Sequence, residues 1–424
     1  MLDIKRIKED PEKVKAGLRA KEVNCDQEVD RILALDKERR DIIFATEQMK
    51  AEQNKVSKTI PQLKKAGEDT APVFQRMGEL KSQIAANDET LRTVEAEYRT
   101  LMLSLPNLPD EDLKPGGKEN NEPLRYFGEP HKFDFPPKHH VDLCTDLGFI
   151  DYTRGVKLAG SGFWMYTGLG ARLEWALLNY FIDTHLADGY EFILPPHMLE
   201  YQCGETAGQF PKFADEVYKI QNPTDDRTHY MLPTAEAALA SIYRDEILAE
   251  ADLPKKFFAY TPCFRREAGS YGKDVRGLNR LHQFDKVEIV QLSLPEKSYE
   301  ALDGMVAHVE SIVKALGLPY RILRLCGGDM SFTSALTYDF EVYSEAQKRW
   351  LEVSSVSNFE SFQANRLKLR YRDEEKKIQL AHTLNGSSLA LPRIVAALLE
   401  NYQTPEGIRI PEALIPYTGF DIIK

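Results

Sequence analysis

A long heptad pattern between residues 26 and 105 constrains most strongly what this chain can fold into. The only glycines in this stretch are Gly67 and Gly78, and apolar residues recur at intervals of three, four or seven. These positions are Leu35, Ile42, Met49 and Val56 in the first half, and Val73, Met77, Leu80, Ile84, Leu91, Val94, Tyr98, Leu101 and Leu105 in the second. The spacing predicts two long helices, each with one apolar seam.

The segment KKAGEDTAP (64–72) separates the two helices, so the simplest structure is one antiparallel hairpin. The second helix, predicted over 73–105, would be roughly 50 Å long at about 1.5 Å per residue. Its seam has one polar interruption, at Asn87, and Thr46 is among the polar residues that interrupt the companion register of the first helix. Taken alone, the pattern also allows a coiled coil that dimerises.

The charge of the chain is acidic overall, with 55 Lys plus Arg against 66 Asp plus Glu and a formal net charge of −11. Taken alone, this argues against a nucleic-acid partner, because binding to phosphates needs positive charge. Local clustering matters more than the sum. Five lysines gather toward the tip of the predicted hairpin: Lys50, Lys55, Lys58, Lys64 and Lys65.

The cysteines and the start of the chain indicate a reducing, cytoplasmic environment. Cys25, Cys144, Cys203, Cys263 and Cys326 are odd in number and widely spaced without a CxxC pair, which argues against a disulfide framework and a sequence-local zinc cluster. The start, MLDIKRIKEDPEKVK, is too charged for a signal peptide. The sequence contains no run of about 18 apolar residues, so we expect no membrane span.

The remainder of the chain has a different pattern of apolar residues, without heptads. At 424 residues the chain predicts two or three domains. We expect a helical arm over 1–105, a linker rich in Pro, Gly and charge over 106–135, and a larger domain over 136–424. Strand-like runs such as 191–196, 255–267, 282–292 and 337–343 alternate with helical segments. Because neither GxGxxG nor GxxxxGK[ST] occurs, the pattern predicts an α+β domain with an antiparallel sheet.

A basic hairpin is predicted within 264–290. Two strand-like runs flank a Gly-rich loop, and five basic residues fall within sixteen positions: Arg265, Arg266, Lys273, Arg276 and Arg280. A hairpin of this kind presents guanidinium forks to phosphates. The alternative is an ordinary solvated basic loop.

Two further clusters have possible roles in chemistry. In 338–358, Glu341 and Glu352 offer carboxylates for Mg²⁺ on a nucleotide, or else are alternating acids on an exposed strand. In HTLNGSSLALPR (382–393), a small polar turn is predicted to precede an amphipathic helix with Arg393 in its first turns. The alternative there is an ordinary N-capped core helix.

Together these segments resemble the three motifs of class II aminoacyl-tRNA synthetases, and specifically the seryl-tRNA synthetase family. The first motif is resembled by the predicted helix ARLEWALLNYF (171–181) and the following segment GYEFILPPHML (189–199), in which Pro196 matches the proline of the motif. The second is FRREAGSYGKD…HQFDKVE, and the third is TLNGSSLALPR. The resemblance covers essentially the whole chain, including GQFPKF (208–213), LPTAE (232–236) and GGDMSF (327–332).

The resemblance implies roles for individual residues. Arg265, Glu267 and Arg393 are the implied catalytic residues, with Arg265 on the α-phosphate and Arg393 and Arg280 on the γ-phosphate. The implied ATP site consists of Arg265, Arg266, Glu267, Arg280, Phe284 against adenine, Glu352, Val353, Ser354, Ser355 and Arg393. Glu352 and Ser355 are implied ligands of Mg²⁺ bound with ATP. The implied L-serine site consists of Thr234, Ala235, Glu236, Arg265, Glu288, Asn385 and Ser387.

The implied activity is that of a serine–tRNA ligase. ATP would activate L-serine as seryl-adenylate, and the seryl group would pass to the 3′ end of tRNA(Ser), with tRNA(Sec) left open as a second substrate. The resemblance also implies a homodimer and no DNA or membrane partner. Two alternatives remain: a synthetase-like ligase for a carrier protein, and a catalytically inactive coiled-coil interaction protein.

The sequence departs from the family pattern at a few positions. TAEAALAS (234–241) stands where TAEVPLTN is frequent, Gly162 and Asn365 stand where Arg is frequent, and Val356 stands where Cys is frequent. None of these departures removes a residue with an implied role.

Overall fold

The computed structural model describes residues 1–221, 227–267 and 277–424. The chain divides into two compact units, which are described separately. One unit comprises residues 2–19 and 24–106, and the other comprises Met1, residues 20–23 and residues 107–424. In the described ranges, no helix is both long and apolar enough to cross a bilayer. Each of the five cysteines is a free thiol.

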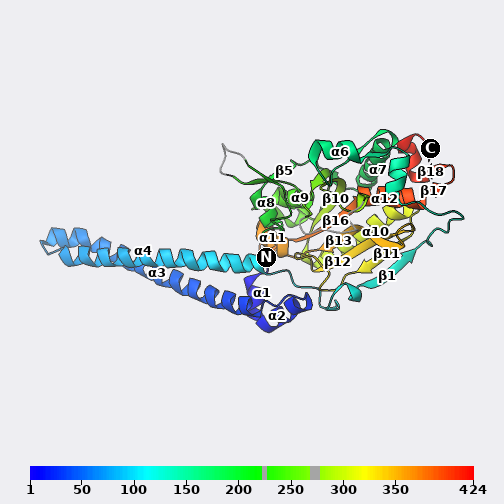
Figure 1. Ribbon diagram of the computed structural model, residues 1–424. Helices are drawn as coiled ribbons and strands as arrows, with labels where there is room; N and C mark the ends of the chain where they lie inside the picture. Colours follow the sequence, from blue (N-terminus) through cyan, green and yellow to red (C-terminus); the bar gives the residue numbers. More distant parts are fainter. Residues whose placement is uncertain (222–226, 268–276) are drawn as a thin grey trace. The chain divides into compact units, whose positions relative to one another are not determined.

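The first unit is the predicted antiparallel hairpin (Figure 1). After the short helices α1 (Ile4–Glu9) and α2 (Pro11–Ala20), α3 runs over Asp26–Ala66 and α4 over Ala71–Ser104. Gly67 ends α3 with a positive φ of 71°, and its N–H donates to the carbonyls of the last turn. The segment 64–72 therefore reverses the direction of the chain at Gly67, as the sequence predicts.

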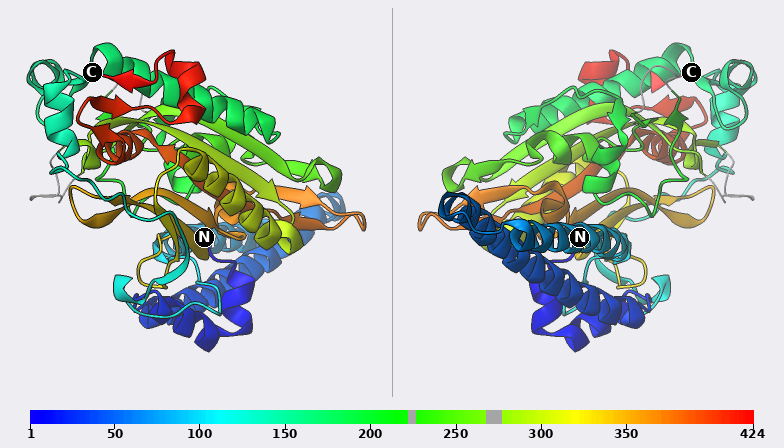
Figure 2. Two further views of the ribbon diagram at one scale, coloured as in Figure 1. Left: turned by 90° about the vertical axis from the view of Figure 1, so that its right-hand side faces the viewer. Right: turned by 90° about the vertical axis from the view of Figure 1, so that its left-hand side faces the viewer.

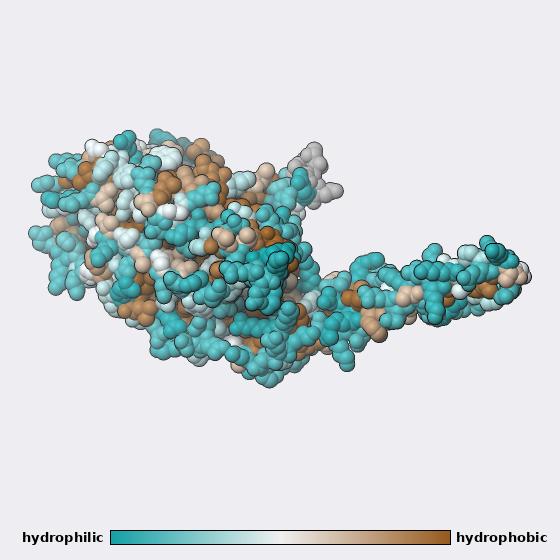
Figure 3. All heavy atoms as spheres, turned by 180° about the vertical axis from the view of Figure 1, so that it is seen from behind, coloured by the Kyte–Doolittle hydropathy of each residue, from teal (hydrophilic) through white to brown (hydrophobic). Residues whose placement is uncertain are grey.

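Both apolar and polar contacts hold α3 against α4. Ile32, Leu35 and Leu80 are fully buried in the seam. At the polar interruption, Asn87 donates to Thr46 Oγ1 at 3.1 Å, so the two polar residues that break the heptad patterns pair with each other. Figure 3 shows a largely hydrophilic hairpin surface on the face in view, which agrees with a narrow apolar seam.

The second unit is built on an eight-stranded sheet with the order β1-β11-β12-β13-β16-β10-β9-β4 (Figures 1 and 2). In that order, the strands span Glu122–Phe127, Tyr320–Arg324, Leu336–Ser344, Arg349–Asn358, His382–Ala390, Gln283–Ser293, Lys255–Phe264 and Glu191–Phe192. Every neighbouring pair is antiparallel except β4 with β9. The predicted α+β class with an antiparallel sheet is confirmed.

The helices pack on the two faces of this sheet. On one face lie α7 (Gly168–Ala187), α10 (Ser298–Ala315) and α12 (Leu391–Asn401), which form the main core with Val287 and Ile289 of β10; Figure 2 shows α10 lying across the strands. On the other face, α9 (Glu236–Ala240) and α11 (Phe362–Leu367) pack with Val290 and Leu292. Because side chains alternate along a strand, β10 directs Lys286 and Glu288 to the α9 and α11 face.

Shorter elements complete the second unit. The helices are α5 (His140–Asp146), α6 (Tyr152–Ala159), α8 (Tyr201–Thr206) and α13 (Ile415–Thr418), and a 3₁₀ turn, η5, spans Gly277–Asn279. The small sheets consist of β2 (Ile150–Asp151) and β3 (Met165–Tyr166); β5 (Met198–Glu200), β6 (Lys219–Ile220) and β7 (His229–Met231); β8 (Ile247–Ala249), β14 (Arg370–Arg372) and β15 (Ile378–Leu380); and β17 (Gln403–Thr404), β18 (Gly407–Arg409) and β19 (Ile422–Ile423).

Some local predictions differ from the structure. The prediction of a polar turn before α12 is wrong, because residues 382–390 form β16 in the middle of the large sheet. Some of its polar side chains bond to neighbouring strands, as when Asn385 donates to Glu288 on β10. The strand predicted over 191–196 spans only Glu191–Phe192. Within the segment predicted as a linker, β1 pairs with β11.

Candidate active site

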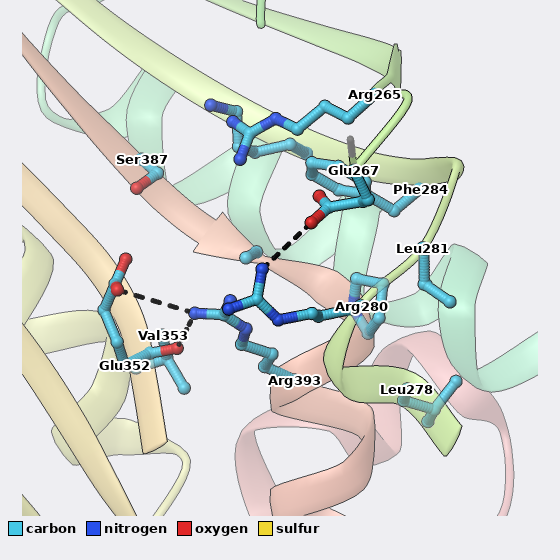
Figure 4. A pocket seen from close by; sticks show the side chains of 13 residues that line it. Arg265, Glu267, Leu278, Arg280, Leu281, Phe284, Glu352, Val353, Ser387 and Arg393 are labelled. Carbon is cyan, nitrogen blue, oxygen red and sulfur yellow. Dashed lines mark hydrogen bonds and ion pairs between the residues drawn. The ribbon is translucent and has the colours of Figure 1, made fainter. Parts of the chain in front are cut away.

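A narrow cavity of about 90 Å³ lies at the ends of β9, β10 and β16 and the start of α12 (Figure 4). Its lining brings together residues from all three predicted clusters: Arg265, Glu267, Leu278, Arg280, Leu281, Phe284, Lys286, Glu352, Val353, Ser387, Ala390, Pro392 and Arg393. These residues span about 130 positions of sequence, so only folding makes them neighbours.

Two ion pairs cross this cavity (Figure 4). Arg280 Nη1 lies 3.0 Å from Glu267 Oε2. Arg393 Nη1 donates to the carbonyl of Glu352 at 2.7 Å and lies 3.7 Å from its Oε2. Arg393 sits in the first turn of α12, where the helix dipole adds positive potential. A polyphosphate that enters the cavity would replace the carboxylates as the acceptor of hydrogen bonds from these two guanidinium groups, which already face the cavity.

Arg265 is fixed by its own neighbours. Its Nε donates to the carbonyl of Pro233 at 3.2 Å, and its guanidinium carbon lies 5.2 Å from the centre of the Phe284 ring. The stacking orients the planar fork as Figure 4 shows. Arg265 therefore lines the same cavity as Phe284, Glu267 and Arg280, as expected for residues of one hairpin.

A second cavity of about 480 Å³ shares Arg265, Glu267 and Arg280 with the first and extends to Thr234 and Glu236. Thr234 connects this cavity to a buried polar network, of which Lys286 lines the first cavity while Glu288 and Asn385 line neither. Lys286 Nζ lies 2.6 Å from Glu288 Oε2 and donates to Thr234 Oγ1 at 2.8 Å. Asn385 Nδ2 donates to Glu288 Oε1 at 3.1 Å.

Ser387 joins the two halves of the site. It pairs with Glu288 across β16 and β10, and its Oγ accepts the N–H of Ser355 at 3.1 Å. The network thus places two carboxylates, an ammonium group and several hydroxyls beside the Arg265 fork. A small molecule with amino, carboxyl and hydroxyl groups finds partners for all three here.

Glu236 faces the second cavity with a shifted pKa. Burial, followed by the charge of Glu288, raises its pKa to about 7, while Lys286, Gln363 and Arg265 oppose the rise. Gln363 Nε2 donates to Glu236 Oε1 at 2.6 Å, and Thr383 Oγ1 donates to Gln363 Oε1 at 2.7 Å. Gln363 and Thr383 were not among the predicted site residues, although Thr383 is the first residue of the third motif, TLNGSSLALPR.

A carboxylate cluster lies at the β12–β13 edge of the first cavity. Asp339 pairs with Ser355 across the strands, and its pKa is raised well above the ordinary value by burial and by the charge of Glu352. Its Oδ1 has no hydrogen-bond partner among the residues that the structure describes. Glu341 instead accepts from Arg321 Nε at 2.5 Å. Asp339 was missed by the sequence analysis, which had singled out Glu341 and Glu352.

Several predicted site residues do not line either cavity as described. Arg266 Nη1 donates to the carbonyl of Asp215 at 3.0 Å. Ala235 is buried in the α9 core. Ser354 Oγ donates to the carbonyl of Ser387, and Ser355 contacts Ser387 through its backbone. Lys273 and Arg276 lie outside the described residues.

The η5 turn, which carries Leu278 into the first cavity, is held by a buried histidine. His140 Nδ1 lies 2.7 Å from Glu400 Oε1, so its Nε2 accepts the N–H of Leu278 at 3.1 Å. Gly277 has φ of +73°, and a Cβ there would lie 2.3 Å from His140 Nε2. With His139 these groups are spaced for a metal ion. Both ring nitrogens of His140, and Nδ1 of His139, which accepts the N–H of Val141, already take part in hydrogen bonds.

Comparison with known proteins gives concordant matches along the chain. Residues 1–109 match the model of the seryl-tRNA synthetase N-terminal domain, and residues 218–402 match the tRNA synthetase class II core domain (G, H, P, S and T). A serine–tRNA ligase 2 of Clostridium acetobutylicum is 48% identical, covering 99% of this chain and 100% of the relative. A serine–tRNA ligase of Salinibacter ruber is also 48% identical, covering 99% of this chain and 98% of the relative.

A solved structure resembles the whole fold. The seryl-tRNA synthetase of Pyrococcus horikoshii, crystallised in complex with ATP, has a TM-score of 0.92 and 33% identity, covering 100% of this chain and 99% of that one.

Proposed function

The chain belongs to the seryl-tRNA synthetase family of class II aminoacyl-tRNA synthetases, and from this premise we propose how its residues carry out the serine–tRNA ligase reaction. The observation that carries the proposal is the continuity of the two cavities at Arg265. One cavity offers guanidinium groups to phosphates, and the other offers Glu236 and Thr234 to an amino acid, with Glu288 two bonds behind Thr234 through Lys286.

The first step is formation of seryl-adenylate. A carboxylate oxygen of L-serine attacks the α-phosphorus of ATP, and pyrophosphate leaves. Arg265 contacts the α-phosphate, Arg280 and Arg393 contact the γ-phosphate, and Phe284 stacks on adenine. Arg266 and Glu267 belong to the same motif, and the backbone from Glu352 to Ser355 completes the nucleotide site. No enzyme nucleophile is needed, because positioning and charge stabilisation lower the barrier.

The amino acid is held in the second cavity. Glu236 with Thr234 receives the ammonium group, and the intervening Ala235 holds the two in place from the α9 core. Glu288, held by Asn385, receives the hydroxyl group together with Ser387 at the side of the first cavity. A site that hydrogen-bonds a hydroxyl rejects the analogue without it by about 10⁴–10⁵, because its polar groups would remain unpaired. This supports serine rather than alanine as the substrate.

Mg²⁺ is the cation we propose for the nucleotide. Glu352 and Ser355 are the proposed ligands, and the unpartnered, buried oxygen of Asp339 beside them supports a cation at this edge. Bound there, Mg²⁺ would neutralise charge on the phosphate oxygens. The carboxylates of Asp339 and Glu352 are fixed on the adjacent strands β12 and β13, whose pairing places Asp339 opposite Ser355.

The second step transfers serine to RNA. The 3′-terminal ribose hydroxyl of tRNA(Ser) attacks the carbonyl carbon of seryl-adenylate, and AMP leaves; tRNA(Sec) is a second candidate for the same assay. We propose residues 1–105 as the tRNA-binding arm, 106–135 as a linker and 136–424 as the catalytic domain. The lysines toward the hairpin tip are exposed, which supports contact with an RNA backbone.

We also propose a homodimer formed through the first-motif helix. On α7, the large apolar side chains of Leu169, Trp175 and Leu186 are 43%, 55% and 49% exposed. A second copy of the chain would cover them.

One pair of assays tests the proposed function. We expect exchange of pyrophosphate into ATP only with serine, followed by charging of tRNA(Ser). Exchange with serine but transfer to a carrier protein instead of tRNA would support the first alternative. Absence of exchange in a folded, dimeric protein would support the inactive interaction protein and contradict the proposal.

Glu288 provides a test of amino-acid selection. We expect Glu288→Ala to raise the serine requirement strongly, to affect ATP binding less, and to narrow the preference for serine over alanine, which is about 10⁴ or more where a hydroxyl is read by hydrogen bonds. Exchange rates with serine and alanine measure both quantities.

The control addresses stability. Removing Glu288 leaves Lys286 buried without its partner, which can cost about 3–5 kcal/mol. Glu288→Gln keeps the shape and should retain more of the stability, so thermal unfolding of both variants separates folding from selection. A reduced stability with an unchanged serine-to-alanine ratio would mean that Glu288 only holds the sheet.

A further inference from the structure

Gln363 lies at the centre of a chain of hydrogen bonds that ends on the proposed amino-acid site. It is 1% exposed, on α11, and contacts three elements at once. Its Nε2 donates to the Ala207 carbonyl at 2.9 Å and to Glu236 Oε1 at 2.6 Å. Its Oε1 accepts from Thr383 Oγ1 at 2.7 Å.

These contacts allow only one orientation of the amide. The carbonyl of Ala207 can only accept, so the nitrogen of Gln363 must face it. The other hydrogen of that nitrogen then points to Glu236, while the hydroxyl of Thr383 serves the amide oxygen. A flipped amide would set two acceptors against each other at Ala207 and again at Glu236.

We propose that Gln363 is a positioning residue for serine binding, which holds the Glu236 carboxylate toward the cavity as an acceptor for the substrate ammonium group. A hydrogen bond from a neutral donor favours the charged form of a carboxylate. Gln363 therefore supports the form of Glu236 that attracts a cation and leaves Oε2 available to the substrate. This inference rests on the proposed function, because it assumes that an amino acid occupies the second cavity.

The surroundings of Glu236 give Gln363 a large influence. Burial and the charge of Glu288 raise the pKa of Glu236 to about 7, and Lys286, Gln363 and Arg265 hold it down. Tyr230 also faces Glu236, and its pKa is raised, so the phenol stays neutral. Glu216, Glu267 and Arg280 line the same cavity. With the pKa near neutrality, loss of one supporting donor changes the charge of the site within the working pH range.

The test is the pH dependence of the serine KM in ATP–pyrophosphate exchange between pH 6 and 8.5, with the full-length protein. In the wild type we expect the serine KM to rise as pH falls through about 7, because Glu236 becomes protonated. Gln363→Met keeps the volume and removes the donor. If this moves the midpoint up by about one pH unit, the serine KM rises about 5–10-fold at pH 6–7 and less than about 2-fold at pH 8.5.

A matched variant separates positioning from packing. Thr383→Val removes the hydroxyl from the far end of Gln363 and leaves the bond to Glu236 in place. We expect its pH midpoint to stay at the wild-type value, and the ATP KM of both variants to stay close to wild type. Glu236→Gln should remove the pH dependence that the wild type shows.

The outcomes distinguish the two levels of the argument. If the wild type showed no serine-dependent exchange, the proposed function itself would fail. If it did exchange, a Gln363→Met profile with an unmoved midpoint, or a midpoint moved equally by Thr383→Val, would overturn the role of Gln363. Should Gln363→Met fold poorly, Gln363→Glu gives the second measurement: added negative charge should move the midpoint upward, and an unmoved midpoint would again overturn the proposal.

Discussion

Replacing Arg265 by alanine is expected to slow serine-dependent ATP–pyrophosphate exchange by about 10²–10³. This is the usual cost of removing one preorganised donor from a developing negative charge. Arg265 is preorganised by its bond to the Pro233 carbonyl and by its stacking on Phe284. Single-turnover formation of the adenylate, measured alongside exchange, would show that the loss lies in the chemical step.

The conservative control is Arg265→Lys. We expect it to be impaired as well, because an ammonium point charge cannot reproduce the planar fork of Arg. Arg266→Ala changes the neighbouring residue of the same motif, whose guanidinium bonds to the Asp215 carbonyl and does not line the described cavities, so we expect a smaller loss than for Arg265→Ala. A folded Arg265→Ala enzyme with a near wild-type adenylation rate would refute the assignment.

Shortening the helical hairpin is expected to abolish tRNA charging while leaving exchange largely intact. Removing residues 30–100 and joining the ends deletes the exposed lysines but none of the residues that line the two cavities. Charging of tRNA(Ser) and exchange, measured on the same preparation, compare the two activities. If both fell together in a folded, dimeric truncation, the proposed division between arm and body would be wrong.

A full-length variant provides the control for the truncation. Changing Lys50, Lys55, Lys58, Lys64 and Lys65 to glutamine keeps the hairpin and removes its positive charge. We expect weaker charging and a reduced dependence of charging on salt, because fewer phosphate counterions would be released. Exchange should remain at the wild-type rate, since the lysines lie outside the cavities.

The large elements could be predicted from the sequence because their signals are local and repeated. The heptads of α3 and α4 encode a hairpin without reference to the rest of the chain, and their polar interruptions at Thr46 and Asn87 meet as partners. The strands β9, β10 and β12 follow runs of β-branched and aromatic residues. By contrast, β16 contains Asn, Gly and two Ser, which is typical of a turn, and as a strand it bonds Asn385 and Ser387 to the neighbouring strands β10 and β13.

Most residues around the first cavity could be predicted to lie together, because its guanidinium and carboxylate groups lie in recognisable motifs. The surroundings of the second cavity could be predicted only in part. Thr383 opens the third motif, but neither it nor Gln363 could be connected with Glu236 from the sequence, because α11, β16 and α9 converge only in the folded chain. Asp339 was missed for a similar reason, since its importance depends on the cross-strand register with Ser355.

The bond between Asn87 and Thr46 gives the hairpin a fixed register. Sliding one helix by a turn would take the buried Thr46 hydroxyl away from Asn87, and a buried polar group left unpaired costs about 1–3 kcal/mol. Distances along the hairpin can therefore be counted from this bond. Lys64 stands 18 residues beyond Thr46, or roughly 27 Å along the axis at about 1.5 Å per residue. Inserting one heptad into each helix beyond this bond would move the lysine cluster outward by roughly 10 Å without changing its charge, so that reach alone would be altered.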